Sequence, residues 1–148
     1  MATNDDAVST LNGLIEVLKD GENGFRTAAD GVTNPEYKSL FNSYAQQRAQ
    51  FASELQAEVR AHGGDPEQSG SVLANIHRGW INIKSAVTGQ DEGAVLAECE
   101  RGEDSAVNNY QDAMKQMLPA STQEIVQRQY AQIKEAHDRI RALRDAHS

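Results

Sequence analysis

Apolar residues recur every three or four positions along most of this chain, which is the spacing of one face of an α-helix. The pattern predicts long helices at about 5–30 and 35–61, a shorter one at about 71–88, and two more at about 92–118 and from 121 toward the C-terminus. Alternating runs rich in Val, Ile, Thr and aromatic residues, which are typical of strands, are absent. The pattern therefore predicts an all-α protein.

Turn and capping residues separate these segments. Asn4 is a candidate N-cap, Gly31 lies just past the first helix, and Asn34 with Pro35 suits the start of the second. Residues 63–66, Gly-Gly-Asp-Pro, end that helix, and Asp91 is expected to cap the fourth. Residues 121–124, Ser-Thr-Gln-Glu, match a capping box and are expected to open the last helix.

Long helices joined by tight turns pack as antiparallel neighbours. The segments therefore predict two helical hairpins that form an antiparallel four-helix bundle. The loop after Gly63 and the short third helix provide the crossover between the hairpins. A length of 148 residues fits a single domain, 1–148, with one core.

Composition narrows the classes of function. The net charge of −8 disfavours binding to nucleic acids or anionic membranes, which needs clustered Lys and Arg. No apolar stretch approaches the roughly 20 residues that cross a bilayer. The first ten residues lack the basic and apolar regions of a signal peptide, and the single Cys99 cannot form an intrachain disulfide. We expect a cytoplasmic protein; self-association is left open.

Several charged residues fall on the predicted core-facing stripes. With about 100° per residue, Glu22 and Glu103 are central on their helices, and Arg48 lies close to the centre of its own. Glu100 and His137 flank the stripes. Counted from the turns, these positions lie at similar depths along the bundle. The sequence thus predicts one polar layer inside the core.

Buried charges must pair with each other or with a metal ion. One interpretation is an ion-pair network that joins Arg48 to Glu22 and Glu103. The alternative is a reduced metal site for iron, manganese or zinc, with Glu22, Glu100, Glu103 and His137 as ligands, since carboxylates and imidazole from facing helices hold metal in ferritin-like bundles. Arg48 would repel a cation placed beside it.

Other residues are given ordinary structural interpretations. Trp80 is expected to anchor the third helix to the bundle, with His77 at its boundary, and Cys99 is expected to be a small buried residue. The mid-helix glycines Gly21, Gly24 and Gly102 adjoin the core acids and indicate either a local bulge or a close helix contact. Arg139, Arg141 and Arg144 suit a solvated helix C-terminus.

The chain also resembles a known group of proteins. The strings DGENGF at 20–25, QRAQF at 47–51, HRGW at 77–80 and, most specifically, ECERGED at 98–104 are similar to an uncharacterised bacterial four-helix-bundle family of the ferritin-like superfamily. The resemblance extends from about Ala7 to Ala146. That family is a domain of unknown function, so the resemblance implies the fold and leaves the activity open.

The ligand pattern of di-iron bundles is only half present. Those proteins supply one Glu from each of two helices and a Glu-x-x-His from each of the other two. This chain has Gln47-x-x-Gln50 and Lys134-x-x-His137 in the latter positions. We therefore expect a non-enzymatic bundle protein, related by analogy to stress responses, whose polar layer is structural or binds a partner. Metal binding is the alternative function.

Overall fold

The computed structural model describes residues 4–66 and 80–147, and these residues form four long helices and one short helix. The long helices are α1 (Asn4–Gly31), α2 (Pro35–Ala61), α4 (Glu92–Met114) and α5 (Ala120–His147), and the short one is α3 (Ile83–Thr88). No strand occurs within the described ranges. The predicted all-α bundle is confirmed, and the bounds of α1 and α2 agree with the prediction to within one residue.

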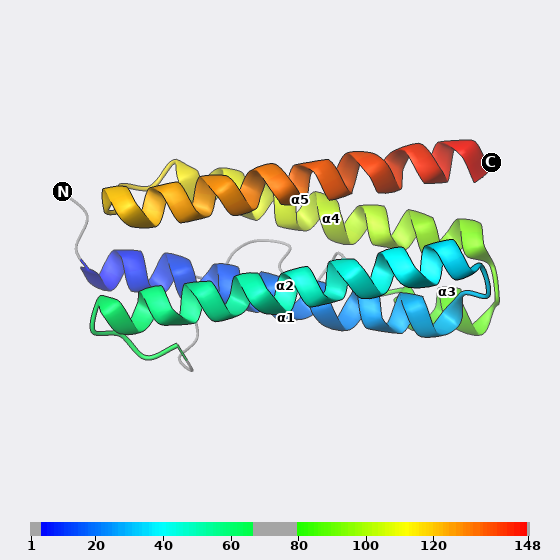
Figure 1. Cartoon of the computed structure of the whole chain (residues 1–148), viewed down its shortest axis with the longest axis horizontal. Helices are drawn as coiled ribbons and strands as arrows, with labels where there is room; N and C mark the ends of the chain where they lie inside the picture. Colours follow the sequence, from blue (N-terminus) through cyan, green and yellow to red (C-terminus); the bar gives the residue numbers. More distant parts are fainter. Residues whose placement is uncertain (1–3, 67–79, 148) are drawn as a thin grey trace.

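The four long helices lie side by side as two antiparallel hairpins, α1–α2 and α4–α5 (Figure 1). Helix α2 ends near the end of the bundle where α1 begins, whereas α4 begins at the opposite end. The connection between the hairpins must therefore traverse the length of the bundle, so α2 and α4 run in the same direction. One long crossover of this kind is the connectivity of ferritin-like bundles.

Local sequence signals explain where α2 and α4 begin and where α2 ends. The Asn34 side chain accepts hydrogen bonds from the backbone N–H groups of Glu36 (2.9 Å) and Tyr37 (3.4 Å). Asp91 accepts from the N–H of Ala94 at 3.2 Å. These bonds satisfy donors that a helix start leaves without partners. After α2, Gly63 has φ 79°, a left-handed conformation that glycine adopts without strain.

The third helix is shorter than the sequence predicted. Within the described residues it begins at Ile83, and Trp80–Asn82 form a turn. The N–H of Asn82 donates to Glu98 Oε2 of α4 at 2.5 Å, so this turn is held against α4 directly before the helix begins. Residues 71–79, including His77, lie outside the described part of the chain.

The turn between α4 and α5 also differs from the prediction. Helix α4 ends at Met114, where its carbonyl accepts from the Gln123 side chain at 3.3 Å, and Met117 is 67% exposed rather than part of the core stripe. Helix α5 begins at Ala120, so the predicted capping role of Ser121 is wrong. Instead, the carbonyl oxygen of Pro119 accepts a hydrogen bond from the backbone N–H of Gln123 at 2.9 Å.

The apolar interior consists of two separate clusters of buried residues. The lower cluster, as we call it, lies toward the α4–α5 turn, and the upper cluster lies toward the α1–α2 turn. Leu14, Leu18, Leu55, Tyr110, Val126 and Ile133 belong to the lower cluster. Phe25, Phe41, Ala45, Leu96, Cys99 and Ile140 belong to the upper cluster. On each long helix a short stretch separates the two sets, and those stretches carry the polar residues considered next.

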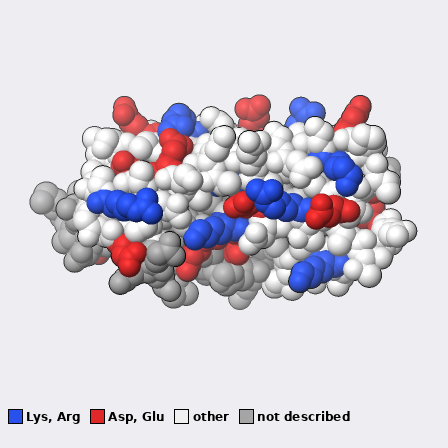
Figure 2. Space-filling view, turned by 60° about the horizontal axis from the view of Figure 1, so that its bottom comes forward, with Lys and Arg blue, Asp and Glu red and all other residues white. Residues whose placement is uncertain are grey.

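Two observations on the described residues bear on contact with membranes and polyanions. Within the described residues, no helix is both long and apolar enough to cross a bilayer. On the face drawn in Figure 2, basic and acidic side chains are interspersed rather than gathered by sign. That face therefore offers no broad basic area of the kind that phosphate backbones bind.

Candidate functional site

A buried ion pair lies between the two apolar clusters. The guanidinium of Arg48, on α2, donates from Nη1 to Glu103 Oε1 at 2.5 Å and from Nη2 to Oε2 at 2.8 Å. Arg48 is 1% exposed and Glu103, on α4, is 0% exposed. Two parallel bonds of this kind are the strongest geometry available to an arginine and a carboxylate. The pair therefore fixes α2 against α4 at one register.

The rest of the guanidinium is enclosed by three further groups. Its carbon lies 5.4 Å from the centre of the Phe25 ring, within the range of a cation–π contact. A Cβ on Gly21 would lie 3.7 Å from Arg48 Cγ, so α1 covers the side chain closely. Arg48 Nε donates to Gln47 Oε1 at 3.2 Å, and Gln47 Nε2 donates to Gln132 Oε1 of α5 at 3.2 Å. All four long helices thus contribute to this layer.

The charges in this layer stabilise one another. Burial would lower the pKa of Arg48, but the opposite charge of Glu103 and the bonds to it raise that pKa above its usual value. Burial, followed by the negative charges of Glu103 and Glu98, raises the pKa of the Cys99 thiol well above its usual value. The layer therefore keeps the Arg48 guanidinium charged, and the thiol of Cys99, in the adjoining upper cluster, is held in its unreactive protonated form.

Glu22 does not join this layer, which corrects the prediction. Its side chain is 26% exposed and accepts from Arg26, four residues on, at 2.9 Å. The position of α1 that faces Arg48 is Gly21. Since adjacent helical residues differ by about 100°, Glu22 points to the flank. The predicted network of Arg48 with Glu22 and Glu103 reduces to the Arg48–Glu103 pair.

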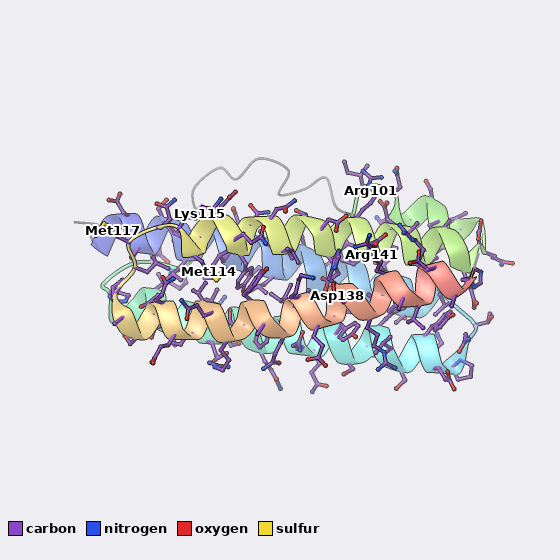
Figure 3. The ribbon with its side chains drawn as sticks, turned by 90° about the horizontal axis from the view of Figure 1, so that it is seen from above. Arg101, Met114, Lys115, Met117, Asp138 and Arg141 are labelled. Carbon is purple, nitrogen blue, oxygen red and sulfur yellow. The ribbon has the colours of Figure 1, made fainter. Side chains whose placement is uncertain are left out.

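The remaining two predicted ligands pair with other groups. Glu100 is 7% exposed and accepts from Arg144 of α5, with Arg141 Nε 3.8 Å from its other oxygen. His137 is also 7% exposed and contacts Asp104 of α4 through Nε2 at 2.6 Å. Figure 3 looks onto these two helices and labels Arg141 beside α4. Both contacts join α4 to α5 outside the central pair.

The predicted metal ligands are therefore not brought together. Glu22, Glu100, Glu103 and His137 are each bonded to a different partner. Among the residues that the structure describes, no group of three or more His, Cys, Asp or Glu side chains has the spacing of a metal site. In Glu103, the most central of the four, both oxygens are already bonded to a fixed cation.

Trp80 forms a wedge between α1 and α4 next to the ion pair. A Cβ on Gly24 would lie 2.2 Å from the indole Cδ2, and a Cβ on Gly102 would lie 2.1 Å from Cε2. The indole also meets the Phe25 ring edge-on, with ring centres 4.9 Å apart. These two helix glycines are thus explained by close contact with one aromatic ring from the turn before α3, which the sequence analysis did not foresee.

A second buried polar contact, which the sequence analysis missed, crosses the lower cluster. The Tyr110 hydroxyl of α4 donates to Gln129 Oε1 of α5 at 2.7 Å, and both residues are 0% exposed. Gln129 Nε2 donates to Glu54 of α2 at 3.0 Å, and Glu54 pairs with Arg128 at 2.6 Å. A signal was present: Gln129 lies between Val126 and Ile133 at core spacing.

Fold and layer together define a class: an all-α bundle whose interior is crossed by an arginine–glutamate pair. The family model described as "Domain of unknown function (DUF2383)" matches residues 6–116, and the chain belongs to that family. The expected membership in an uncharacterised family is thereby confirmed. The matched residues run from α1 through α4 and include Arg48, Trp80 and Glu103, while α5 follows them. Comparison with curated proteins finds no match.

Proposed function

We propose that this chain is a non-enzymatic, ferritin-like bundle protein whose polar layer is structural or binds a partner. The observation that carries the proposal is the bidentate contact between Arg48 and Glu103. A guanidinium stays charged at any physiological pH. It therefore neutralises the central carboxylate permanently, in the place where a di-iron bundle would use metal.

The neighbouring positions support this interpretation. In the two helices where a di-iron bundle would carry Glu-x-x-His, Gln47 bonds to Arg48 and Gln132, and Lys134 bonds to Asp138 at 2.7 Å. Amide and ammonium groups are poor substitutes for carboxylate ligands of iron or manganese. Cys99 lies four residues before Glu103, and its burial keeps the thiol protonated. Oxygen activation is therefore not part of the proposed function.

Location and physiological role extend the proposal. We place the protein in the cytoplasm, because its only cysteine is buried and free and its net charge is −8. By analogy with other bundles of this type, the partner belongs to a stress response. Quantifying the protein in fractionated cells, before and after oxidative or nutrient stress, tests both points. Recovery from a membrane fraction, or unchanged abundance under every stress, contradicts them.

Metal analysis provides the decisive test of the structural role. The intact protein is purified without added metal, assayed by elemental analysis, and assayed again after anaerobic incubation with Fe(II), Mn(II) or Zn(II) followed by gel filtration. We expect less than one metal ion per ten chains in every case, and no oxygen consumption with Fe(II). Stoichiometric metal that is lost from both Glu22→Ala and His137→Ala would overturn the proposal.

A matched variant makes the test specific for the ion pair. Glu103→Gln removes the charge and keeps the shape, and circular dichroism confirms whether the helices persist. The proposal requires that the parent binds no metal, because Arg48 already occupies both oxygens of Glu103. The variant should bind no metal either. Metal uptake by the parent that Glu103→Gln abolishes would identify Glu103 as a ligand, and the proposal would fail.

A further inference from the structure

His137 makes contact with a carboxylate on each side of its ring. Nε2 lies 2.6 Å from Asp104 Oδ1 on α4, and Nδ1 lies 3.0 Å from Asp138 Oδ1 on α5. A neutral imidazole carries one N–H and one lone pair, so it can donate to only one of these oxygens. Only the imidazolium can donate to both. The geometry of the described side chains is therefore that of the protonated ring.

We propose that His137 is a proton-controlled link between α4 and α5, which is tight when the ring is protonated and weakened when it is neutral. The proposal concerns a contact outside the Arg48–Glu103 pair and goes beyond the function proposed above. When the ring loses a proton, its Nε2–H tautomer can still donate a hydrogen bond to Asp104. Nδ1 then has no proton to donate, so the hydrogen bond to Asp138 is lost. The retained bond then has a neutral donor in place of a cationic one, so the attraction between the ring and the Asp104 carboxylate is weaker.

The surrounding charges decide how the link responds. Asp138 also accepts hydrogen bonds from Lys134 Nζ, at 2.7 Å to Oδ1 and 2.9 Å to Oδ2. The charge of Asp138 therefore stays compensated when the hydrogen bond from His137 is lost. On α4, Asp104 directly follows Glu103, whose charge is matched by Arg48 of α2. The two aspartates that face the ring are thus the charges that hold its proton.

The position of the link gives it an effect beyond one hydrogen bond. His137 is 7% exposed and follows Ala136, which is 2% exposed in the core. Asp104 lies one residue from the carboxylate that fixes α2 to α4. The state of the ring therefore acts on the stretch of α4 that carries the central pair. Two other contacts between α4 and α5 are made by Arg144 and Arg141 with Glu100, and these contacts do not involve the ring of His137.

The balance of physical causes favours the protonated ring more than in an ordinary histidine. Burial lowers the pKa of His137, but the hydrogen bonds to Asp138 and Asp104, together with their charges, raise it above the usual value. The change of state therefore falls on the alkaline side of an ordinary histidine, which titrates at about 6.5.

Two measurements on the intact chain test the proposal. The first follows the His137 ring resonances by NMR from pH 5 to 9, in the parent and in Asp104→Asn. We expect a midpoint above that of a free histidine, and a clearly lower midpoint in Asp104→Asn. A parent midpoint at or below the ordinary value, or one that Asp104→Asn does not move, would overturn the proposal.

The second measurement is amide hydrogen exchange, corrected for the intrinsic pH dependence of the exchange chemistry. Protection of α4 amides near Asp104 should fall on the order of fivefold when the pH rises through the midpoint, as expected for the loss of one charged hydrogen-bond partner. In His137→Gln the same amides should show no such step, and amides at the Asn34-capped start of α2 serve as the internal control. A step that persists in His137→Gln assigns the effect to another group and overturns the proposal.

Discussion

Gly24 of α1 and Gly102 of α4 face each other across the indole ring of Trp80, and neither position has room for a side chain. A Cβ at either glycine would lie within 2.2 Å of an indole carbon. The turn that carries Trp80 is in turn held to α4 by the bond from the Asn82 N–H to Glu98. The two glycines therefore leave the space between α1 and α4 that the Trp80 side chain occupies.

Replacing Gly102 with alanine should destabilise the protein by about 1–3 kcal/mol, the usual cost of overpacking a well-filled core. Gly21→Ala is the matched control, because a Cβ there would lie 3.7 Å from Arg48, an ordinary contact distance. That control should be neutral or stabilising by up to about 1 kcal/mol, since alanine favours helix over glycine. Urea denaturation measures both, and equal effects of the two substitutions would refute the wedge.

Removing one partner of the central pair should be far more damaging than removing both. Glu103→Gln leaves the Arg48 charge buried and unmatched, at a cost of about 3–5 kcal/mol. The double variant Arg48→Met with Glu103→Leu should recover most of that loss, because well-packed apolar residues often replace a buried ion pair without penalty. Urea unfolding of Arg48→Met, of Glu103→Leu and of the double variant closes a double-mutant cycle and gives the coupling energy.

The partly exposed pair of Glu22 and Arg26 provides the comparison for that cycle. Glu22→Gln should change the free energy of unfolding by no more than about 0.5 kcal/mol, as is usual for solvent-accessible pairs at this spacing. If Glu22→Gln costs as much as Glu103→Gln, the assignment of Glu22 to the flank of α1 is wrong.

Cys99 should be chemically silent in the folded protein. It is 0% exposed, and burial together with the nearby negative charges keeps its pKa high, so the reactive thiolate is scarce. We expect a disulfide reagent such as Ellman's reagent to modify it at least a hundredfold more slowly than in urea, a contrast set by how rarely the core opens. Rapid modification of the native protein would show that the upper cluster is more open than the structure indicates.

The stability contributed by His137 should depend on pH with a definite sign. Its folded pKa is raised above its unfolded value, so protonation favours the folded state. The contribution is fully present below about pH 6.5, the unfolded pKa, and is lost as the pH rises through the folded pKa. The difference in unfolding free energy between the parent and His137→Gln should therefore shrink from pH 5.5 to pH 9. A difference that grows with pH would contradict the assignment.

The helices and the depth of the polar layer could be predicted because both follow from spacing along single helices. Pro35 begins α2 and Gly63 follows its end. Arg48 and Glu103 lie on the core-facing stripes of their helices at the same depth along the bundle. Those two residues do meet in the structure. Helical periodicity was sufficient for this part because each long helix is amphipathic over six or more turns.

The rest depended on contacts between helices, which periodicity does not encode. Glu22 and Gly21 differ by one position, and only the close approach of Arg48 shows which of them faces inward. The N-terminal limit of α3 is set by Glu98, sixteen residues away from Asn82. The partners of Glu100 and His137 lie on α5 and α4, and their choice depends on how those helices are rotated about their axes. A prediction from one helix at a time cannot supply that rotation.

The division of the interior by the Arg48–Glu103 layer bears on the cooperativity of unfolding. Each apolar cluster has its own set of side chains from α1, α2, α4 and α5, and each reaches one end of the bundle. Proteins often open in parts that coincide with such separately packed units. In native-state hydrogen exchange the two ends of every long helix should then fall into different stability classes, so that the boundary between them crosses the helices at the ion pair instead of following the hairpins.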